Sequence, residues 1–504
     1  MPNNFSYFAI FAWPVVVFFL FRAFPRVQAL VASIVGGYLL LPSAVGINPP
    51  MLPTIDKTLV PALSAFLMCH LTSDSRGRRR IPAPVDEVAG QAEMSRRGDR
   101  YRKERMRGNR RRGAFQDADE KKNGKKIRDS RLFNFLILLL IITPFLTVAQ
   151  NLENYVSGPL VISGLRIYDA FSFALTSLVS VMPYILARQY ISREKEQELL
   201  LYGICIAGLL YSLPTLFEIR MSPQLSKWTY GFLSQSFVQA RRGDSFRPVV
   251  YLHHGLWLAI FMAMATIAAF SAWRVRRRFS WFIGGLWVFG TLLLSSSLGA
   301  LALALLFLPV AILFSIRTQL LVAAAFAAII VTYPLLRGAG LVPVDGITEI
   351  ASSISEERAK SFAFRIKNED MLLDHANNKP IAGWGRFGRN LVYDQVTGRN
   401  LSITDGAWII IVGTSGWLGY IASYGLLSLP IFLLYRRRRQ LNIGFATSGL
   451  CLVLIVNLVD TIPNGTITPL TWLIAGALAG RSRVTEPSIE AAEPNSRSNR
   501  MVRG

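Results

Sequence analysis

Arginines in the last third of this 504-residue sequence are the residues best suited to chemistry. Arg358 and Arg365 are seven residues apart, so a helix would place both on one face, about 10.5 Å apart. Guanidinium groups form paired, charge-assisted hydrogen bonds with phosphate oxygens. The spacing therefore predicts an anion clamp. The alternative is a solvated arginine face in which Arg365 pairs with Glu369 one turn further along.

A glycine-rich turn follows in the stretch NNKPIAGWGRFGRN (377–390). Its three glycines have the GxGxxG spacing of dinucleotide-binding loops, but that fingerprint requires a strand before it and a helix after it. Pro380 precedes the glycines and no strand–helix pattern surrounds them, so we predict no dinucleotide cofactor. The glycines instead predict a turn with close backbone approach, which would present Arg386 and Arg389 from a rigid bend.

Two further residues are functional candidates. In the stretch FRPVVYLHHG (246–255), Arg247 is a second anion-binding candidate, with extension of its side chain to the membrane interface as the alternative. His254 is a polar residue at the edge of an apolar run, either functional or bonded to a neighbouring helix.

Long apolar segments are the elements that must position these residues. The chain is 52% hydrophobic and has a mean hydropathy of +0.36, yet its net charge is +24. Apolar runs of about 17–25 residues, separated by basic connectors, explain both values. We predict an all-α, polytopic membrane helix bundle with one large outer loop that contains an amphipathic helix. The thirteen predicted spans are residues 6–22, 28–45, 58–72, 132–150, 168–187, 198–216, 249–271, 280–295, 298–316, 319–336, 406–434, 443–459 and 466–480.

Lysine and arginine predict the orientation of the bundle, because they accumulate in cytoplasmic connectors. The segment 73–131 has 20 Lys/Arg against 10 Asp/Glu, and with thirteen spans every other basic connector falls on its side. The N-terminus is then outside and the C-terminus inside. The predicted segments are N-terminal membrane helices (1–72), a basic, disordered cytoplasmic loop (73–131), membrane core helices (132–336), a large extracytoplasmic loop (337–405), C-terminal membrane helices (406–480) and a disordered cytoplasmic tail (481–504).

The basic segment 73–131 is predicted to contact membrane lipids and not nucleic acid. Anionic lipids attract clustered lysine and arginine, whereas nucleic-acid binding also uses aromatic side chains that stack on bases. Only Tyr101 and Phe115 are aromatic in this segment. The three cysteines lie in or beside apolar runs, without a CxxC motif or a Cys/His cluster, so we predict neither a disulfide framework nor a metal site.

Several blocks of the sequence resemble the O-antigen ligase/polymerase and exopolysaccharide polymerase superfamily. Two of them are RAKSFAFRIKNEDMLLDHANNKPIAGWGRFGRN (358–390) and ITDGAWIIIVGTSGWLGYIASYGLL (403–427). The turn SSSLGA (295–300), the block RRGDSFRPVVYLHHGLWLAIF (241–261) and the large outer loop are similar to further features of that superfamily. The resemblance covers residues 200–480 and depends on the order and the membrane side of these motifs.

The resemblance implies a metal-independent, inverting glycosyltransferase with a GT-C-like fold of membrane helices. Members of the superfamily take a glycan from an undecaprenyl-diphosphate carrier outside the bacterial inner membrane and pass it to another glycan or to a lipid acceptor. The expected partners are this lipid-linked glycan, membrane lipids and other polysaccharide export proteins, without a cofactor. The residues expected to bind the diphosphate are Arg247, Arg358, Arg365, Arg386 and Arg389.

One position departs from the superfamily pattern, which has a histidine shortly before a GxxG pair. Gly416 and Gly419 match the pair, but Asp405 stands at the histidine position, followed by Gly406. An aspartate at its reference pKa of about 4 is a weaker base than histidine. We expect Asp405 to deprotonate the attacking hydroxyl, with His254 as the second candidate. The alternative is that the transfer chemistry is altered or absent.

The function predicted from these features is polymerisation of undecaprenyl-diphosphate-linked oligosaccharide units into exopolysaccharide or O-antigen. An O-antigen ligase that transfers glycan to a lipid acceptor would share this chemistry. A transporter of lipid-linked oligosaccharide would be expected to carry charges in the middle of its spans. The predicted spans carry almost none, which favours an enzyme. A catalytically inactive scaffold of an export complex is the third alternative.

Overall fold

Long apolar helices dominate the chain in the computed structural model. The structure describes residues 2–49, 52–72, 131–242, 245–342, 346, 349, 352–353 and 356–484. Within these ranges, seven helices are long and apolar enough to cross a membrane by length and composition. They are α1 (Asn4–Ala23), the helix Arg131–Ala149, α5 (Ile167–Tyr190), α6 (Glu194–Met221), α9 (Gly255–Arg276), α12 (Ile316–Gly338) and α15 (Ala407–Leu441).

Shorter helices lie between the long ones and pack with them. They are α2 (Arg26–Leu40), α3 (Leu59–Leu71), α10 (Phe279–Leu294), α11 (Leu298–Leu313), α16 (Phe445–Asp460) and α17 (Pro469–Arg481). Each of the thirteen predicted spans overlaps one of these long or short helices. The centre of the bundle is α9, which packs against α6, α10, α11 and α16 and is buried along most of its length. A helix that is apolar on every face is suited to this place.

Contacts divide the chain into two units, residues 1–69 with 136–504 and residues 70–135. In the second unit the structure describes only 70–72 and 131–135, at the end of α3 and the start of the next helix. The predicted basic loop 73–131 lies outside the described residues except for Arg131. The predicted tail lies outside them beyond residue 484.

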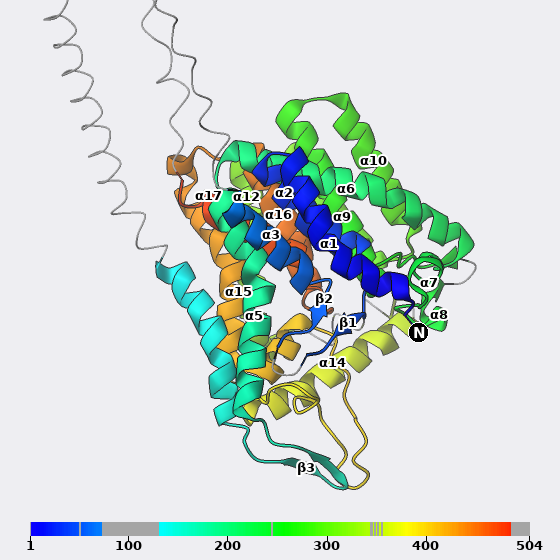
Figure 1. Cartoon of the computed structure of the whole chain (residues 1–504), viewed down its shortest axis with the longest axis vertical. Coiled ribbons are helices and arrows are strands. Elements are labelled where there is room, and N and C mark those ends of the chain that lie inside the picture. The colour runs from blue at the N-terminus through cyan, green and yellow to red at the C-terminus, as the bar shows by residue number, and fades with distance from the viewer. Residues whose placement is uncertain are drawn as a thin grey trace, which may run out of the picture. The chain divides into compact units, whose positions relative to one another are not determined.

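Hairpins and helices also occur in the connectors that were predicted to lie outside the membrane. They are the antiparallel pairs β1 (Gly46–Ile47) with β2 (Ile55–Asp56), β3 (Tyr155–Ser157) with β4 (Leu160–Ile162) and β5 (Arg241–Arg242) with β6 (Ser245–Phe246), and the helices α7 (Leu225–Tyr230), α8 (Phe237–Ala240) and α14 (Glu356–Asn377). Figure 1 shows α14, β1, β2 and β3 at the same end of the bundle. In α14, Leu372, Leu373 and Ala376 are buried while Lys367, Asp370 and Asp374 are exposed, which is the pattern of the predicted amphipathic helix.

Four connectors that were predicted to be cytoplasmic contact one another. At the end of α9, Arg276 pairs with Glu198 near the start of α6, with nitrogen and oxygen 2.9 Å apart. Arg481, at the end of α17, is fully buried and pairs with Glu194 at 3.3 Å. Arg481 also donates a hydrogen bond to the carbonyl of Leu441 at the end of α15. The ends of α6, α9, α15 and α17 are therefore linked by two ion pairs and a backbone hydrogen bond.

The predicted span 249–271 begins too early, because α9 begins at Gly255. The buried carboxylate of Glu218 accepts the backbone N–H groups of Val249 and Val250, at 2.8 and 2.7 Å. A buried carboxylate is stable when several donors surround it. These two residues therefore remain outside the helix although they are apolar.

Candidate functional site

The glycine-rich turn binds a break in α15. Within this helix Gly416 has φ +63° and ψ −169°, which interrupts the helical hydrogen bonds. The carbonyls of Gly413 and Thr414 instead accept the N–H groups of Trp384 and Gly385, both at 2.9 Å. A broken helix in a membrane protein needs such partners for its freed backbone groups.

The turn also accepts hydrogen bonds from the other side of the break. The N–H groups of Trp417 and Leu418 donate to the carbonyls of Pro380 and Ile381, at 2.7 and 3.2 Å. Gly383 has φ +72°, and a Cβ atom there would lie 2.6 Å from backbone atoms of α15. The turn with close backbone approach is therefore confirmed, and Gly383 is the residue that allows its contact with α15.

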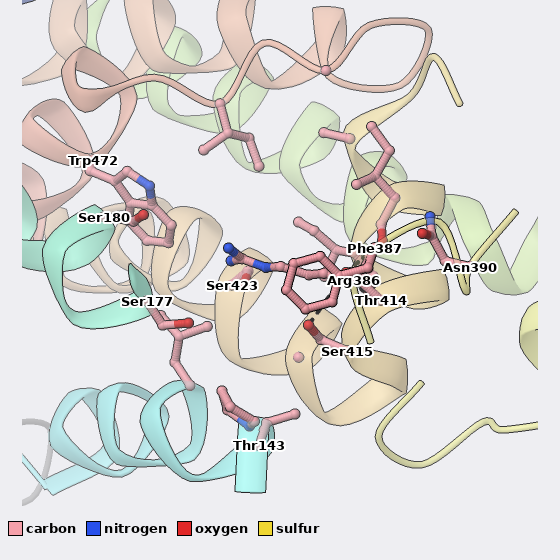
Figure 2. A pocket seen from close by; sticks show the side chains of 18 residues that line it. Thr143, Ser177, Ser180, Arg386, Phe387, Asn390, Thr414, Ser415, Ser423 and Trp472 are labelled. Atoms are coloured by element: carbon pink, nitrogen blue, oxygen red, sulfur yellow. Dashed lines mark hydrogen bonds between the residues drawn. The ribbon is translucent and has the colours of Figure 1, made fainter. Parts of the chain in front are cut away.

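An open pocket of about 520 Å³ lies beside this turn, between the helix Arg131–Ala149, α5, α15 and the start of α17 (Figure 2). Its walls combine hydroxyl groups with apolar side chains such as Ile410, Phe387 and Trp472. The hydroxyl groups are those of Thr143, Ser177, Ser180, Thr414, Ser415 and Ser423. Such a lining can bind a ligand that has both polar and apolar parts.

Arg386 reaches from the turn into this pocket, as Figure 2 shows. Its guanidinium carbon lies 5.0 Å from the centre of the Phe173 ring. No ion pair or hydrogen bond with another described residue engages this guanidinium. Arg386 is exposed at the open pocket, and the apolar side chains around it lower its pKa below the usual value, because they disfavour the charged form. Arginine nevertheless stays charged, so the pocket offers an unneutralised cation to an anionic ligand.

A second pocket, of about 80 Å³, contains the ion pair of Arg365 and Asp405, whose Nε and Oδ2 atoms are 3.5 Å apart. Their side chains are 36% and 39% exposed, so a ligand can reach both. Ile409 lines this pocket and Ile410 lines the larger one, which places the two pockets on neighbouring faces of α15. The structure thus brings two of the predicted site residues into contact.

Glu369 lines the smaller pocket as well, but it is buried. Its Oε2 accepts a hydrogen bond from Tyr333 Oη at 3.2 Å. Burial raises the pKa of Glu369 to about 7, although Tyr333 and Arg337 act in the opposite direction. The alternative in which Arg365 pairs with Glu369 is therefore wrong, because the partner of Arg365 is Asp405.

Arg389 lines neither pocket, which argues against its predicted role in diphosphate binding. Its side chain is only 2% exposed. Its guanidinium donates to the carbonyls of Glu153, Ile162 and Ser163, at 3.1, 3.4 and 3.1 Å. These donors hold the β3–β4 hairpin against the glycine-rich turn, so the group is used within the protein.

Replacing Arg389 with alanine is expected to lower the free energy of unfolding by about 2 kcal/mol, because three carbonyls lose a charged donor. Arg386→Ala should have a much smaller effect, because its guanidinium makes no hydrogen bond or ion pair with a described residue and loses only its contact with the Phe173 ring. Denaturant unfolding of both purified variants in detergent measures the difference. An equal loss in both variants would contradict these two assignments.

The other three predicted residues fall elsewhere. His254 caps α9, where its Nδ1 accepts the N–H group of Leu256 at 3.0 Å, so this nitrogen is occupied. Arg247 lines neither pocket, and its Nη2 lies 3.5 Å from the carbonyl oxygen of Ser296. The backbone of Arg358 belongs to α14, while its side chain lies outside the described residues.

Glu369 and the hydroxyl side chains of the larger pocket were not predicted as site residues. Ser177 and Ser180 are three residues apart in an apolar helix, and Thr414 with Ser415 directly precedes the break in α15. Polar residues that share one face of a membrane helix tend to face a cavity or another helix. This spacing is a signal that could have identified them.

In the part of the chain that the structure describes, no three His, Cys, Asp or Glu side chains lie close enough together to hold a metal ion. No protein-family model matches the chain, and no curated protein matches it. Its function therefore has to be inferred from the two pockets.

Proposed function

We propose that this chain is a membrane glycosyltransferase that polymerises undecaprenyl-diphosphate-linked oligosaccharide units outside the bacterial inner membrane. The observation that carries the proposal is Arg386, whose guanidinium enters a hydroxyl-lined pocket with only the Phe173 ring beside it and no hydrogen bond or ion pair among the described residues. A lipid diphosphate supplies the missing anion. Its glycan supplies hydroxyls that bond with the serines and threonines, and its prenyl chain suits the apolar wall.

The proposed reaction is a single displacement at the anomeric carbon of the donor. A hydroxyl of the acceptor glycan bonds to this carbon while the bond to the diphosphate oxygen breaks, and the bonding electrons leave with the lipid diphosphate. Arg386 and Arg365 stabilise the charge that develops on the leaving oxygen. The attacking hydroxyl loses its proton to a carboxylate of the smaller pocket, which both Asp405 and Glu369 line. Such a displacement inverts the anomeric configuration.

Thirteen spans in a GT-C-like bundle, with the N-terminus in the periplasm and the C-terminus in the cytoplasm, belong to the same proposal. Two observations support it. Each predicted span overlaps a helix, and basic connectors predicted to share one side contact one another. With this orientation α14 and both pockets face the periplasm, where lipid-linked glycans are polymerised.

Reconstitution in liposomes tests the proposal. The purified protein receives undecaprenyl-diphosphate oligosaccharide, and a gel reports the length of the products. The wild type is expected to give a ladder. Arg365→Ala should slow its formation by about 10–100-fold, because one cation beside the leaving group is lost. Arg317→Ala, in the first turn of α12, should not change the rate.

Other outcomes distinguish the alternatives. An intact donor without any ladder would overturn the polymerase assignment. A single transfer to an added lipid acceptor would indicate a ligase. Movement of the donor across the bilayer without a new bond would indicate a transporter.

A further inference from the structure

The smaller pocket contains two carboxylates in different surroundings. We propose that Glu369 accepts the proton of the attacking hydroxyl and that Asp405 positions Arg365, an inference that rests on the proposed function. The acceptor oxygen then bonds to the anomeric carbon, the electron pair of the broken bond leaves with the lipid diphosphate, and the hydroxyl proton goes to the Glu369 carboxylate. Glu369 later releases this proton to water.

The contacts of Asp405 suit a positioning role. Its Oδ2 lies 3.5 Å from Arg365 Nε, and both side chains are more than a third exposed. An arginine side chain with this exposure is flexible, so it needs a partner that fixes its guanidinium near the leaving group. The oxygen that Asp405 directs at Arg365 holds this guanidinium in the pocket.

The contacts of Glu369 suit proton uptake. The residue is 8% exposed and lines the same pocket. The hydroxyl of Tyr333 bonds to its Oε2 at 3.2 Å, which fixes the carboxylate in place. Because burial raises the pKa of Glu369 to about 7, this carboxylate holds a proton more strongly than one in water. A base with a pKa near the working pH is the most effective.

The charges around Glu369 largely cancel one another. On α12, Arg337 pairs with Asp370 of α14 at 2.6 Å. Across the pocket, Arg365 pairs with Asp405. The charged and titratable groups on the surrounding elements are Tyr333 and Arg337 of α12, Arg365 and Asp370 of α14, Asp405 ahead of α15, and Asp460 of α16, which lies near Arg365. Because Arg337 and Arg365 are each paired with an aspartate, the loss of water around Glu369 is the largest influence on its pKa.

The dependence of ladder formation on pH tests this assignment in the reconstituted full chain. The wild-type rate should rise with pH through a midpoint near 7, because the ionised form of Glu369 is the base. Glu369→Gln should lower the rate by about 100-fold or more and remove this step. Asp405→Asn should lower the rate but keep the midpoint.

A second variant moves the midpoint without removing either carboxylate. Tyr333→Phe deletes the hydrogen bond that favours the ionised form of Glu369. The midpoint should therefore shift to higher pH. In the described chain Tyr333 bonds to Glu369, whereas Asp405 pairs with Arg365, so an unchanged midpoint would overturn the assignment to Glu369.

Stability gives a readout that does not depend on transfer activity. The pKa of Glu369 rises from 4.5 to about 7 on folding, so the folded chain binds this proton more strongly than the unfolded chain. Its stabilising effect is complete below the unfolded pKa and is lost as pH rises through the folded pKa. As the pH rises from 4.5 to about 7, the melting temperature of the wild type should therefore fall. Glu369→Gln should flatten this part of the plot of melting temperature against pH.

Three results would contradict the inference or its premise. A Glu369→Gln enzyme with the wild-type rate and pH step overturns the role of Glu369 alone. A wild type that forms no ladder overturns the proposed function instead. If Glu369→Gln does not fold, Glu369→Asp retains a carboxylate and should retain a pH step, and its absence would contradict the assignment.

Discussion

Arg386→Ala is expected to lower the rate of glycan transfer by about 10²–10³-fold, the loss seen when one preorganised donor to a developing negative charge is removed. Among the described residues that line the larger pocket, Arg386 is the only charged one, so its loss leaves Arg365 as the single cation beside the leaving group. The initial rate of ladder formation at saturating donor measures the effect. Unfolding of the same preparation shows whether the variant is folded.

Two variants serve as controls for Arg386. Arg386→Lys keeps the positive charge but loses the planar fork of donors, so it should retain more activity than Arg386→Ala. Arg399→Ala removes an exposed arginine from the same loop and should have the wild-type rate. Equal losses in Arg386→Ala and Arg399→Ala would show that the net charge of the loop matters and the pocket does not.

Gly416→Ala is expected to lower the free energy of unfolding by at least about 3 kcal/mol, because a non-glycine residue at this backbone geometry is strained. At φ +63° its Cβ would also overlap the carbonyl of Ile381 in the glycine-rich turn. The turn must then move. Because the turn carries Arg386, transfer activity should be lost together with stability. Denaturant unfolding and the ladder assay measure the two effects.

Gly290→Ala is the matched control for this substitution. Gly290 lies inside α10, and a Cβ atom there meets no other atom within 4 Å. Alanine should be neutral or stabilise the helix by up to about 1 kcal/mol. If Gly416→Ala were as stable as Gly290→Ala, the break in α15 would not need glycine.

The helices could be predicted because their signal is local. Apolar runs of sufficient length form helices wherever they occur, and the turn SSSLGA does separate α10 from α11. The start of α9 could not be predicted in this way. It depends on the carboxylate of Glu218, which lies 31 residues before Val249 in the sequence. A contact of that kind leaves no periodic pattern.

In the candidate site, too, the local features could be predicted and the long-range contacts could not. Glycine at positive φ is a property of the residue itself, so the turn that carries Arg386 could be expected. The fate of Arg389 could not, because its acceptor at Ser163 is 226 residues away in the sequence. Arg386 and Arg389 both lie in the glycine-rich turn. Arg389 is buried because it bonds to the β3–β4 hairpin, whereas Arg386 lines the larger pocket.

The buried pair of Arg481 and Glu194 has a consequence for biosynthesis. The two residues are 287 positions apart, and ribosomes add about 5–20 residues per second. Glu194 therefore leaves the ribosome roughly 15–60 s before its partner at these rates. During this interval Glu194 can bond with Thr447 of α16 but lacks its arginine, so its charge is neutralised only after α17 has been synthesised.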